Sequence, residues 1–323
     1  MNFSYPLLLI VLIFTIKPSF ANSTVLSVGY NCIDYIMETN TDFDESDEKE
    51  AQSFKSLPGG QAATVAYTLK GLGMNSFYFG KFGNDNNAEV IKKSLVDYGV
   101  NIDLCIIEES PNQTAFIDVD IRTGEKKIIG YKHSSLSLNE VELNKNILQK
   151  FHYIFIDGHE PHFSLKLVYA AKQLKIPIIA DIEHFSLETK QLISYIDYLI
   201  VPEKVAISAT NTKDLKRAIS ILQKMGPKEV VITLGKNGCL GIDSKKRIFF
   251  TKAYEDIKVV DSTGAGDNFH AAFIYALYKG LDFKDILSFS NYLGAVSCEF
   301  QGARIPSQKL NSIFNEWQLI KKN

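Results

Sequence analysis

Short apolar runs rich in β-branched and aromatic residues alternate along this chain with segments in which apolar residues recur every three or four positions. The runs predict buried strands and the periodic segments predict amphipathic helices. Such an alternation is typical of a mostly parallel sheet with helices on both faces, because parallel strands need crossover connections. We predict strands at residues 25–30, 77–82, 153–157, 176–181, 198–201 and 230–234, and helices at 62–72, 88–98, 165–174 and 215–225.

Two segments interrupt this alternation. Residues 114–121 and 126–131 are strand-like and flank the turn residues Thr123 and Gly124, which predicts a β-hairpin. Together with strand-like pieces at 35–38 and 53–57, the hairpin is expected to form a small second sheet. The alternative is an extension of one edge of the main sheet.

Composition and charge fit one large α/β core. The chain has 323 residues, of which 46% are hydrophobic and 22% charged. The formal net charge is -2 and no long basic run occurs, which argues against nucleic acid as a partner. The cysteines lack the spacing of a metal site, so we expect free thiols at Cys32, Cys105, Cys239 and Cys298.

Residues 260–269 read V-D-S-T-G-A-G-D-N-F and lead directly into an apolar helical pattern. The two glycines permit a tight turn with no side chain between an anion and the backbone amides. The first N–H groups of the helix have no intrahelical partner and lie at the positive end of its dipole. The segment therefore predicts a site for a transferring phosphoryl group, with Asp267 beside it to accept a proton. The alternative is an ordinary helix start with Asp as a cap.

The same segment resembles a family signature. Residues 261–267, D-S-T-G-A-G-D, are similar to the D-T-x-G-A-G-D signature of the ribokinase or PfkB family of carbohydrate kinases. Residues 28–34 resemble the first strand of that family with its sugar-binding Asp, and 58–64 resemble its G-G-x-x-x-N helix. Residues 80–85 resemble its G-x-x-G-x-D turn and 233–238 its T-L-G-x-x-G nucleotide loop. Five matches in the family's order are much more specific than any one alone.

The resemblance implies both a fold and an activity. The expected fold is a three-layer α/β/α, ribokinase-like domain at residues 22–323, with a small β-sheet lid formed by about 35–57 and 113–132. The expected enzyme is an ATP-dependent sugar kinase that transfers the γ-phosphate to a primary hydroxyl of a monosaccharide. ATP and Mg²⁺ are the implied cofactors, and K⁺ is a further one that the resemblance allows. In this family the lid is often also a homodimer contact.

The resemblance also implies roles for residues on the acceptor side. Asp267 is expected to be the general base. The expected anion site consists of Gly264, Ala265 and Gly266. The expected sugar-binding residues are Asp34, Gly59, Gly60, Gln61 and Thr64. Local sequence alone also allows a turn cap at Asp34 and a hinge at the glycine pair. The family has Asn where this chain has Thr64, so the sequence does not define the sugar.

On the nucleotide side, ATP is expected at Thr233, Gly235, Gly238 and Asn291. The alternative for the first two is a strand end followed by a tight turn. Many members of the family carry an N-x-x-E motif that helps to hold magnesium through water. That motif is absent here as such, and Glu203 in the sequence V-P-E-K is its expected substitute. The Arg of the family hairpin is replaced by Lys126 or displaced to Arg122.

Two other functions remain open. The first is a nucleoside kinase of the same fold. The second is a non-catalytic sugar-binding protein. No Walker A sequence occurs, which disfavours a P-loop kinase, and no G-x-G-x-x-G follows the first strand, which disfavours a dinucleotide-dependent dehydrogenase.

The N-terminus resembles a signal peptide. Residues 7–16 are apolar but too few to span a bilayer, and Ser19-Phe20-Ala21 resembles a cleavage site. No Lys or Arg precedes the apolar run, so a non-native extension over residues 1–21 is the alternative. We expect no membrane association after processing. A cytoplasmic location is slightly favoured because the enzyme would use ATP, although export stays open.

Overall fold

The structure is a computed structural model that describes residues 23–40, 50–122, 126–142 and 144–322. The predicted signal peptide or extension, residues 1–21, therefore lies outside the described residues. Within the described part of the chain, no helix combines the length and apolar character needed to cross a bilayer.

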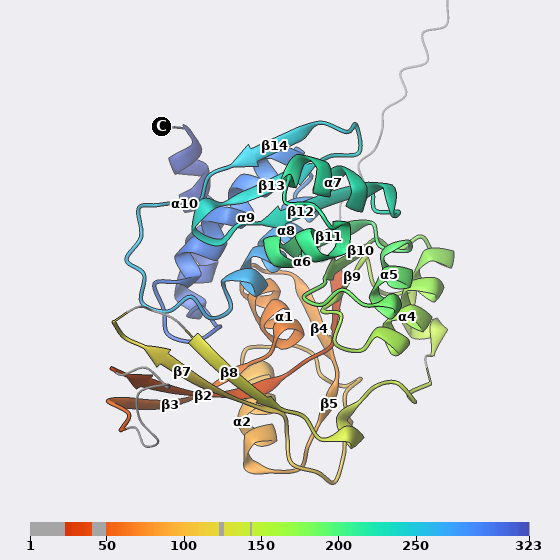
Figure 1. Ribbon diagram of the computed structural model, residues 1–323. Coiled ribbons are helices and arrows are strands. Elements are labelled where there is room, and N and C mark those ends of the chain that lie inside the picture. Colours follow the sequence, from red (N-terminus) through yellow and green to blue (C-terminus); the bar gives the residue numbers. More distant parts are fainter. Residues whose placement is uncertain (1–22, 41–49, 123–125, 143, 323) are drawn as a thin grey trace, which may run out of the picture.

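An eight-stranded sheet forms the centre of the molecule (Figure 1). In spatial order its strands are β14 (Ile248–Thr251), β13 (Cys239–Ile242), β12 (Glu229–Thr233), β11 (Tyr198–Pro202), β10 (Ile178–Asp181), β9 (Tyr153–Ile156), β1 (Thr24–Val28) and β4 (Asn75–Phe79). The strands from β12 to β4 run parallel, whereas β13 and β14 are antiparallel to their neighbours. The prediction of a mostly parallel sheet is therefore confirmed.

Helices cover both faces of the sheet and make the three predicted layers. Alternate strand residues enter opposite cores, so Phe155 packs on one face while Ile154 and Ile156 pack on the other. The Phe155 face is covered by α1 (Gln61–Gly71), α2 (Asn86–Asp97), α8 (Ala265–Tyr278), α9 (Phe283–Ser297) and α10 (Ser307–Lys322). The opposite face is covered by α3 (Lys145–Leu148), α4 (Pro161–Gln173), α5 (Leu187–Ile193), α6 (Glu203–Thr210) and α7 (Leu215–Lys224).

Side-chain caps explain where several helices begin. The carboxylate of Asp85 accepts the N–H of Ala88 at the start of α2, at 2.9 Å. Asp214 and Asp282 accept backbone N–H groups in the same way at the starts of α7 and α9. These contacts satisfy donors that have no partner inside the helix.

A second, four-stranded sheet projects beside the main one (Figure 1). Its strands, in spatial order, are β3 (Ser53–Gly59), β2 (Cys32–Thr39), β7 (Thr114–Asp120) and β8 (Lys126–Tyr131). The last two pair antiparallel, as the sequence predicts for a hairpin. We call these four strands the small sheet. It is a separate sheet, so the alternative of an edge extension is wrong.

Some element boundaries differ from the prediction. The strand predicted at 77–82 is divided, because β4 ends at Phe79 and the chain then pairs in β5 (Lys81–Phe82) with β6 (Ile106–Ile107). At Gly80 the backbone passes so close to the carbonyl oxygen of Gly29 that a Cβ would lie 2.7 Å from it. The apolar pattern continues across this glycine, so it could not reveal the change of sheet.

The helix predicted at 165–174 also begins earlier than expected. It starts at Pro161, where the missing N–H of proline costs no hydrogen bond. Two short 3-10 turns complete the described elements: η1 (Ser134–Leu136) and η2 (Gly235–Asn237).

Candidate active site

Residues 261–267, at the start of α8, have the geometry of an anion site, and we call them the anion loop. Gly264 adopts a left-handed conformation with φ of 74°, and a Cβ there would lie 2.5 Å from the Cα of Ala303. Only glycine fits this turn without displacing backbone. Among the described residues, the backbone N–H groups of Gly264, Gly266 and Asp267 have no hydrogen-bond acceptor. They are therefore available to a bound anion.

A buried asparagine holds this loop in place. The Nδ2 of Asn268 donates to the carbonyl oxygens of Gly264 and Ala303, at 2.8 and 2.9 Å. Its Oδ1 accepts the hydroxyl of Thr68 on α1, at 2.7 Å. Because Asn268 has no exposed surface, these bonds are shielded from water. Asn268 thus supports the anion loop from α1 and from the segment around Ala303.

Asp267 lies in the first turn of α8, next to these donors. Burial raises the pKa of its carboxyl group to about 8, and the nearby carboxylates of Glu183, Asp157 and Asp34 raise it further in that direction. A base is most effective when its pKa lies near the working pH. The surroundings of Asp267 therefore suit proton transfer better than an exposed carboxylate would.

Two aspartates near Asp267 come from strand ends that the sequence analysis did not single out. Asp157 follows β9, and Asp181 is the last residue of β10. Both side chains are buried, with exposed fractions of 2% and 4%. Burial, with Glu183 and Asp267 nearby, raises the pKa of Asp181 well above its ordinary value. A polar residue directly after an apolar strand was the available signal, but aspartate is also common in turns.

A buried histidine lies between Asp181 and the anion loop. The Nδ1 of His270 lies 2.6 Å from the carbonyl oxygen of Gly266, and since a carbonyl only accepts, Nδ1 carries the proton. The other ring nitrogen, Nε2, lies 3.8 Å from Oδ1 of Asp181. Burial lowers the pKa of His270 to about 4, so the ring is neutral near pH 7. His270 consequently adds no positive charge to this acidic region.

On the sugar side, Asp34 lies within β2 and Gly59 lies on the adjacent β3. A Cβ on Gly59 would be 2.1 Å from Oδ2 of Asp34, so the glycine makes room for the carboxylate. Asp34 accepts the thiol of Cys32 at 3.0 Å, and burial raises its pKa to about 6. Because the residue is inside a strand, the alternative of a turn cap is wrong.

The other predicted sugar residues surround the start of α1. Gly60 is the residue before the helix, with φ of 90°. The amide oxygen of Gln61 lies 2.9 Å from Nε2 of His159, whose ring stacks on Tyr30 at 4.9 Å between centroids. Thr64 has no exposed surface, and its hydroxyl has no partner among the described residues. Gln61 is therefore hydrogen-bonded to His159, a residue for which the sequence predicted no role in the site.

Arg304 is a further residue that the sequence analysis missed. Its guanidinium carbon lies 5.2 Å from the ring centroid of Tyr67, and Nη1 donates to the hydroxyl of Ser94. Its positive charge opposes the rise in the pKa of Asp34, and burial lowers its own pKa to about 10. A single arginine in an irregular segment carries no local motif, so no sequence signal marked it.

A cavity of 450 Å³ adjoins the anion loop, and every residue that the sequence predicts to bind ATP lines it. Thr233 ends β12, Gly235 begins the turn η2 and Gly238 follows it, and Asn291 lies on α9. The Nδ2 of Asn291 is bound to the carbonyl oxygens of Thr251 and Lys252. The cavity runs from Ala265 and Gly266 to apolar walls, which suits a ligand with a charged and an aromatic end. Those walls are Tyr254, Ile257, Val259, Phe269 and Ala295.

Glu203, the predicted magnesium residue, is exposed and begins α6. The next residue, Lys204, acts on the pKa of Asp181, so the start of α6 lies near the acidic strand ends. Within the described ranges, no three His, Cys, Asp or Glu side chains are grouped to hold a metal ion directly. A metal here would need ligands from water or from a bound nucleotide.

Comparisons with known proteins identify the family of this chain. The family model described as pfkB family carbohydrate kinase matches residues 22–310. Fructokinase-2 of Oryza sativa subsp. japonica is 27% identical over 332 residues, covering 92% of this chain and 94% of the rice protein. Two solved structures share the fold, each with a TM-score of 0.78.

The first of these structures is Arabidopsis thaliana ribokinase complexed with ribose and ATP, which is 22% identical and covers 91% of this chain and 98% of its own. The second is Burkholderia thailandensis nucleoside kinase in complex with inosine, which is 16% identical and covers 93% of this chain and 99% of its own. The anion loop, the cavity beside it and the family match lead to one conclusion. The chain belongs to the pfkB family of carbohydrate kinases, which are phosphotransferases with an alcohol group as acceptor.

Proposed function

We propose that this protein is an ATP-dependent sugar kinase that transfers the γ-phosphate of ATP to a primary hydroxyl of a monosaccharide. The observation that carries the proposal is the position of Asp267. Its neighbours Ala265 and Gly266 line the nucleotide cavity, while Asp34 is close enough to act on its pKa. Asp267 thus lies where a donor from one side and an acceptor from the other would meet.

Each part of the site has a task in this reaction. The carboxylate of Asp34 accepts hydrogen bonds from sugar hydroxyls and fixes the ring. Asp267 accepts the proton of the primary hydroxyl as its oxygen attacks. The free N–H groups of Gly264, Gly266 and Asp267 donate to the phosphoryl oxygens as charge builds on them. The nucleotide cavity binds ATP through Thr233 and its neighbours.

Mg²⁺ fits the chemistry of these residues. The carboxylate of Glu183 raises the pKa values of both Asp181 and Asp267, and a nearby dication would relieve that repulsion. We propose that the ATP phosphates hold the ion, with water linking it to Glu203 and to the acidic strand ends. When bound, it would neutralise charge on the phosphates. Dependence on K⁺ is a further proposal, tested by replacing K⁺ with Na⁺ in the assay.

The test is a mass-spectrometric assay of the purified protein with ATP, Mg²⁺ and one acceptor at a time. D-fructose and D-ribose represent sugars, and inosine represents nucleosides. A product heavier by one phosphoryl group from either sugar, together with ADP, is the expected result. Phosphorylation of inosine but of no sugar would replace the proposal with a nucleoside kinase. Sugar binding without any ADP would favour the non-catalytic alternative, which the free amides of the anion loop oppose.

We propose in addition that the small sheet forms a homodimer contact. Its outward face carries the exposed side chains of Phe54, Phe116 and Ile129, with Tyr35 stacked between the two phenylalanine rings. An apolar sheet face of this kind commonly marks an interface. Light scattering of wild-type protein and of Ile129→Glu should show a dimer and a monomer, respectively. Leu187→Glu, which changes a leucine on α5 that is somewhat more exposed than Ile129, is the control.

We propose a cytoplasmic location, because ATP is available there. Sequencing the mature N-terminus from the native host tests this proposal. A protein that starts at Asn22 in an extracytoplasmic fraction would contradict it.

A further inference from the structure

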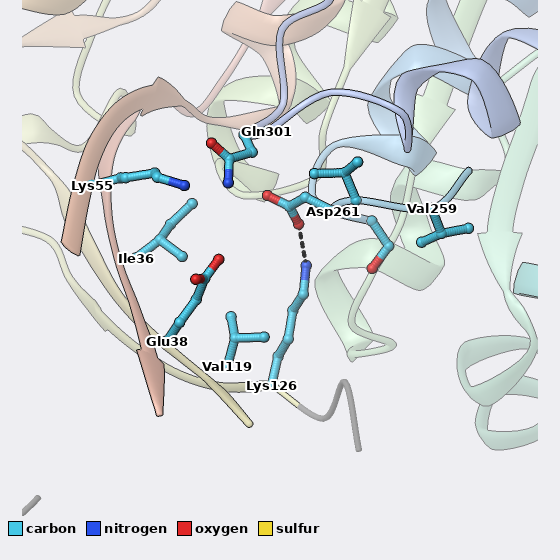
Figure 2. Close-up of a pocket in the computed structure, with 10 residues that line it drawn as sticks. Ile36, Glu38, Lys55, Val119, Lys126, Val259, Asp261 and Gln301 are labelled. Carbon is cyan, nitrogen blue, oxygen red and sulfur yellow. Dashed lines mark hydrogen bonds and ion pairs between the residues drawn. The ribbon is translucent and has the colours of Figure 1, made fainter. Parts of the chain in front are cut away.

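A lysine of the small sheet reaches across to the anion loop. The Nζ of Lys126, at the start of β8, donates to Oδ1 of Asp261 at 2.7 Å and to the hydroxyl of Thr263 at 2.8 Å (Figure 2). The side chains of Lys126 and Asp261 are 20% and 12% exposed, so solvent screens the pair only in part. The contact joins segments that are 135 residues apart.

Asp261 is the group that shapes the beginning of the anion loop. Its Oδ1 also accepts the backbone N–H and the hydroxyl of Thr263, at 2.9 and 2.7 Å. Its Oδ2 accepts the N–H of Gly302 at 2.9 Å. Gly264, the left-handed residue of the turn, follows directly after Thr263. Lys126 is therefore bound to the same carboxylate that sets the direction of the chain into the phosphoryl-transfer site.

A cavity of 120 Å³ separates the small sheet from the loop at this place. Figure 2 shows Ile36, Glu38, Lys55 and Lys126 on the sheet side, with Asp261 opposite them. Since a cavity leaves few apolar contacts across it, packing alone fixes the two walls only weakly there. The hydrogen bonds of Lys126 bridge the gap.

The two walls belong to different parts of the proposed reaction. The small sheet carries Asp34, which we assign to the sugar, on the strand β2. The loop wall includes Val259 and Ser262, which also line the nucleotide cavity. A shift of the sheet when sugar binds would move Lys126, and Lys126 would carry that shift to Asp261 and the loop amides.

We propose that Lys126 is a positioning residue that couples the small sheet to the anion loop, so that the loop amides reach their working geometry when the sheet is in place over the sugar. The proposal rests on the kinase function proposed above. Lys126 contacts neither the nucleotide cavity nor Asp267, so it acts through Asp261. The cation is required because it neutralises a carboxylate that would otherwise repel the phosphates of the donor.

Hydrogen exchange of the full chain without ligand tests the contact directly. In Lys126→Met the amides of Thr263 and Gly302, which both donate to Asp261, should exchange about tenfold faster than in wild type, because Asp261 loses one of its supports. Lys126→Arg should restore most of the protection. Lys55→Met is the matched control, since Lys55 lines the same cavity and has no hydrogen-bond or ion-pair partner among the described residues. Equal exchange in Lys126→Met and Lys55→Met would overturn the proposal.

A second measurement tests the coupling. Binding of the ATP analogue AMP-PNP with Mg²⁺ should slow exchange of the β8 amides in wild type and in Lys55→Met, but not in Lys126→Met. With the sugar that wild type phosphorylates, Lys126→Met should lower kcat by about 10- to 100-fold and change KM less than about threefold. A kcat within threefold of wild type would contradict the inference.

The two proposals can fail separately. If wild type phosphorylates none of the acceptors, the kinase proposal fails, whereas the exchange of the ligand-free variants still decides whether Lys126 supports the loop. If wild type is an active kinase and the loop exchanges alike in all variants, only the inference about Lys126 fails.

Discussion

The proposed nucleotide and sugar sides of the site, which we place on either side of Asp267, differ in the chemical groups that they contain. The nucleotide side consists of backbone N–H groups, glycine turns and apolar walls. The sugar side consists of buried ionisable side chains, among them Asp34, Asp157 and Arg304. Backbone donors keep their properties at every pH, whereas buried carboxylates titrate and repel one another. We therefore expect the buried carboxylates of the sugar side to determine how activity depends on pH. We also expect their mutual repulsion to be the main electrostatic cost to stability in the site.

The largest expected effect comes from the residue that belongs to both sides. Asp267→Asn removes the proton acceptor but keeps the size of the side chain, so kcat should fall by about two to four orders of magnitude. AMP-PNP affinity, measured by calorimetry, should change little because the backbone donors remain. A variant within threefold of wild type in kcat would show that Asp267 is not the base.

Substitutions at the two glycines of the anion loop should have different effects, one on folding stability and the other on catalysis. A Cβ at Gly266 meets no atom within 4 Å, whereas one at Gly264 would collide with Ala303. Gly266→Ala should therefore keep its melting temperature and lose about 10- to 100-fold in kcat/KM, because the new methyl group points into open space beside the amides. Gly264→Ala should instead lose about 1–3 kcal/mol of folding stability. Denaturant unfolding and steady-state kinetics of both variants provide the test, and equal stabilities would contradict it.

The pH dependence of kcat/KM should follow the ionisation of the buried carboxyl group of Asp267. Because the pKa of Asp267 is raised to about 8 and the base must be ionised, kcat/KM should increase by about tenfold per pH unit below pH 8 and level off above it. Equilibrium binding of AMP-PNP, which depends on backbone donors, should vary much less over the same range. A rate profile that is flat from pH 6 to 9 would contradict the role of this carboxyl group.

The smallest expected effect is on stability. The pKa of Asp267 is higher in the folded chain than in an unfolded one, so the folded state holds the extra proton and loses stability as the pH rises from about 4 to about 8. Asp267→Asn removes this loss. In the absence of nucleotide and metal, its melting temperature should exceed that of wild type by a few degrees at pH 8 and by less at pH 5. A difference that does not change with pH would show that the repulsion is absent.

The same contrast explains what the sequence could reveal. The three-layer fold and the anion loop were predictable because periodicity and the run from Asp261 to Asp267 are local signals. Asp157 and Arg304 were not predictable, because each gains its role only from neighbours that the fold brings from distant segments. The Lys126 contact with Asp261 depends on how two sheets approach each other, which no local pattern records. The change of sheet at Gly80 was hidden for the same reason.

The long-range hydrogen bond between Thr68 and Asn268 has a consequence for how the enzyme is made. It joins helices 200 residues apart, and the loop that it supports also needs Ala303, which is synthesised later still. Contacts of such sequence separation form late, because the intervening chain must first lose its freedom. On the ribosome, α1 and the strands around it emerge long before α8 and the segment that holds it. Catalytic competence is therefore among the last properties that a newly made chain acquires.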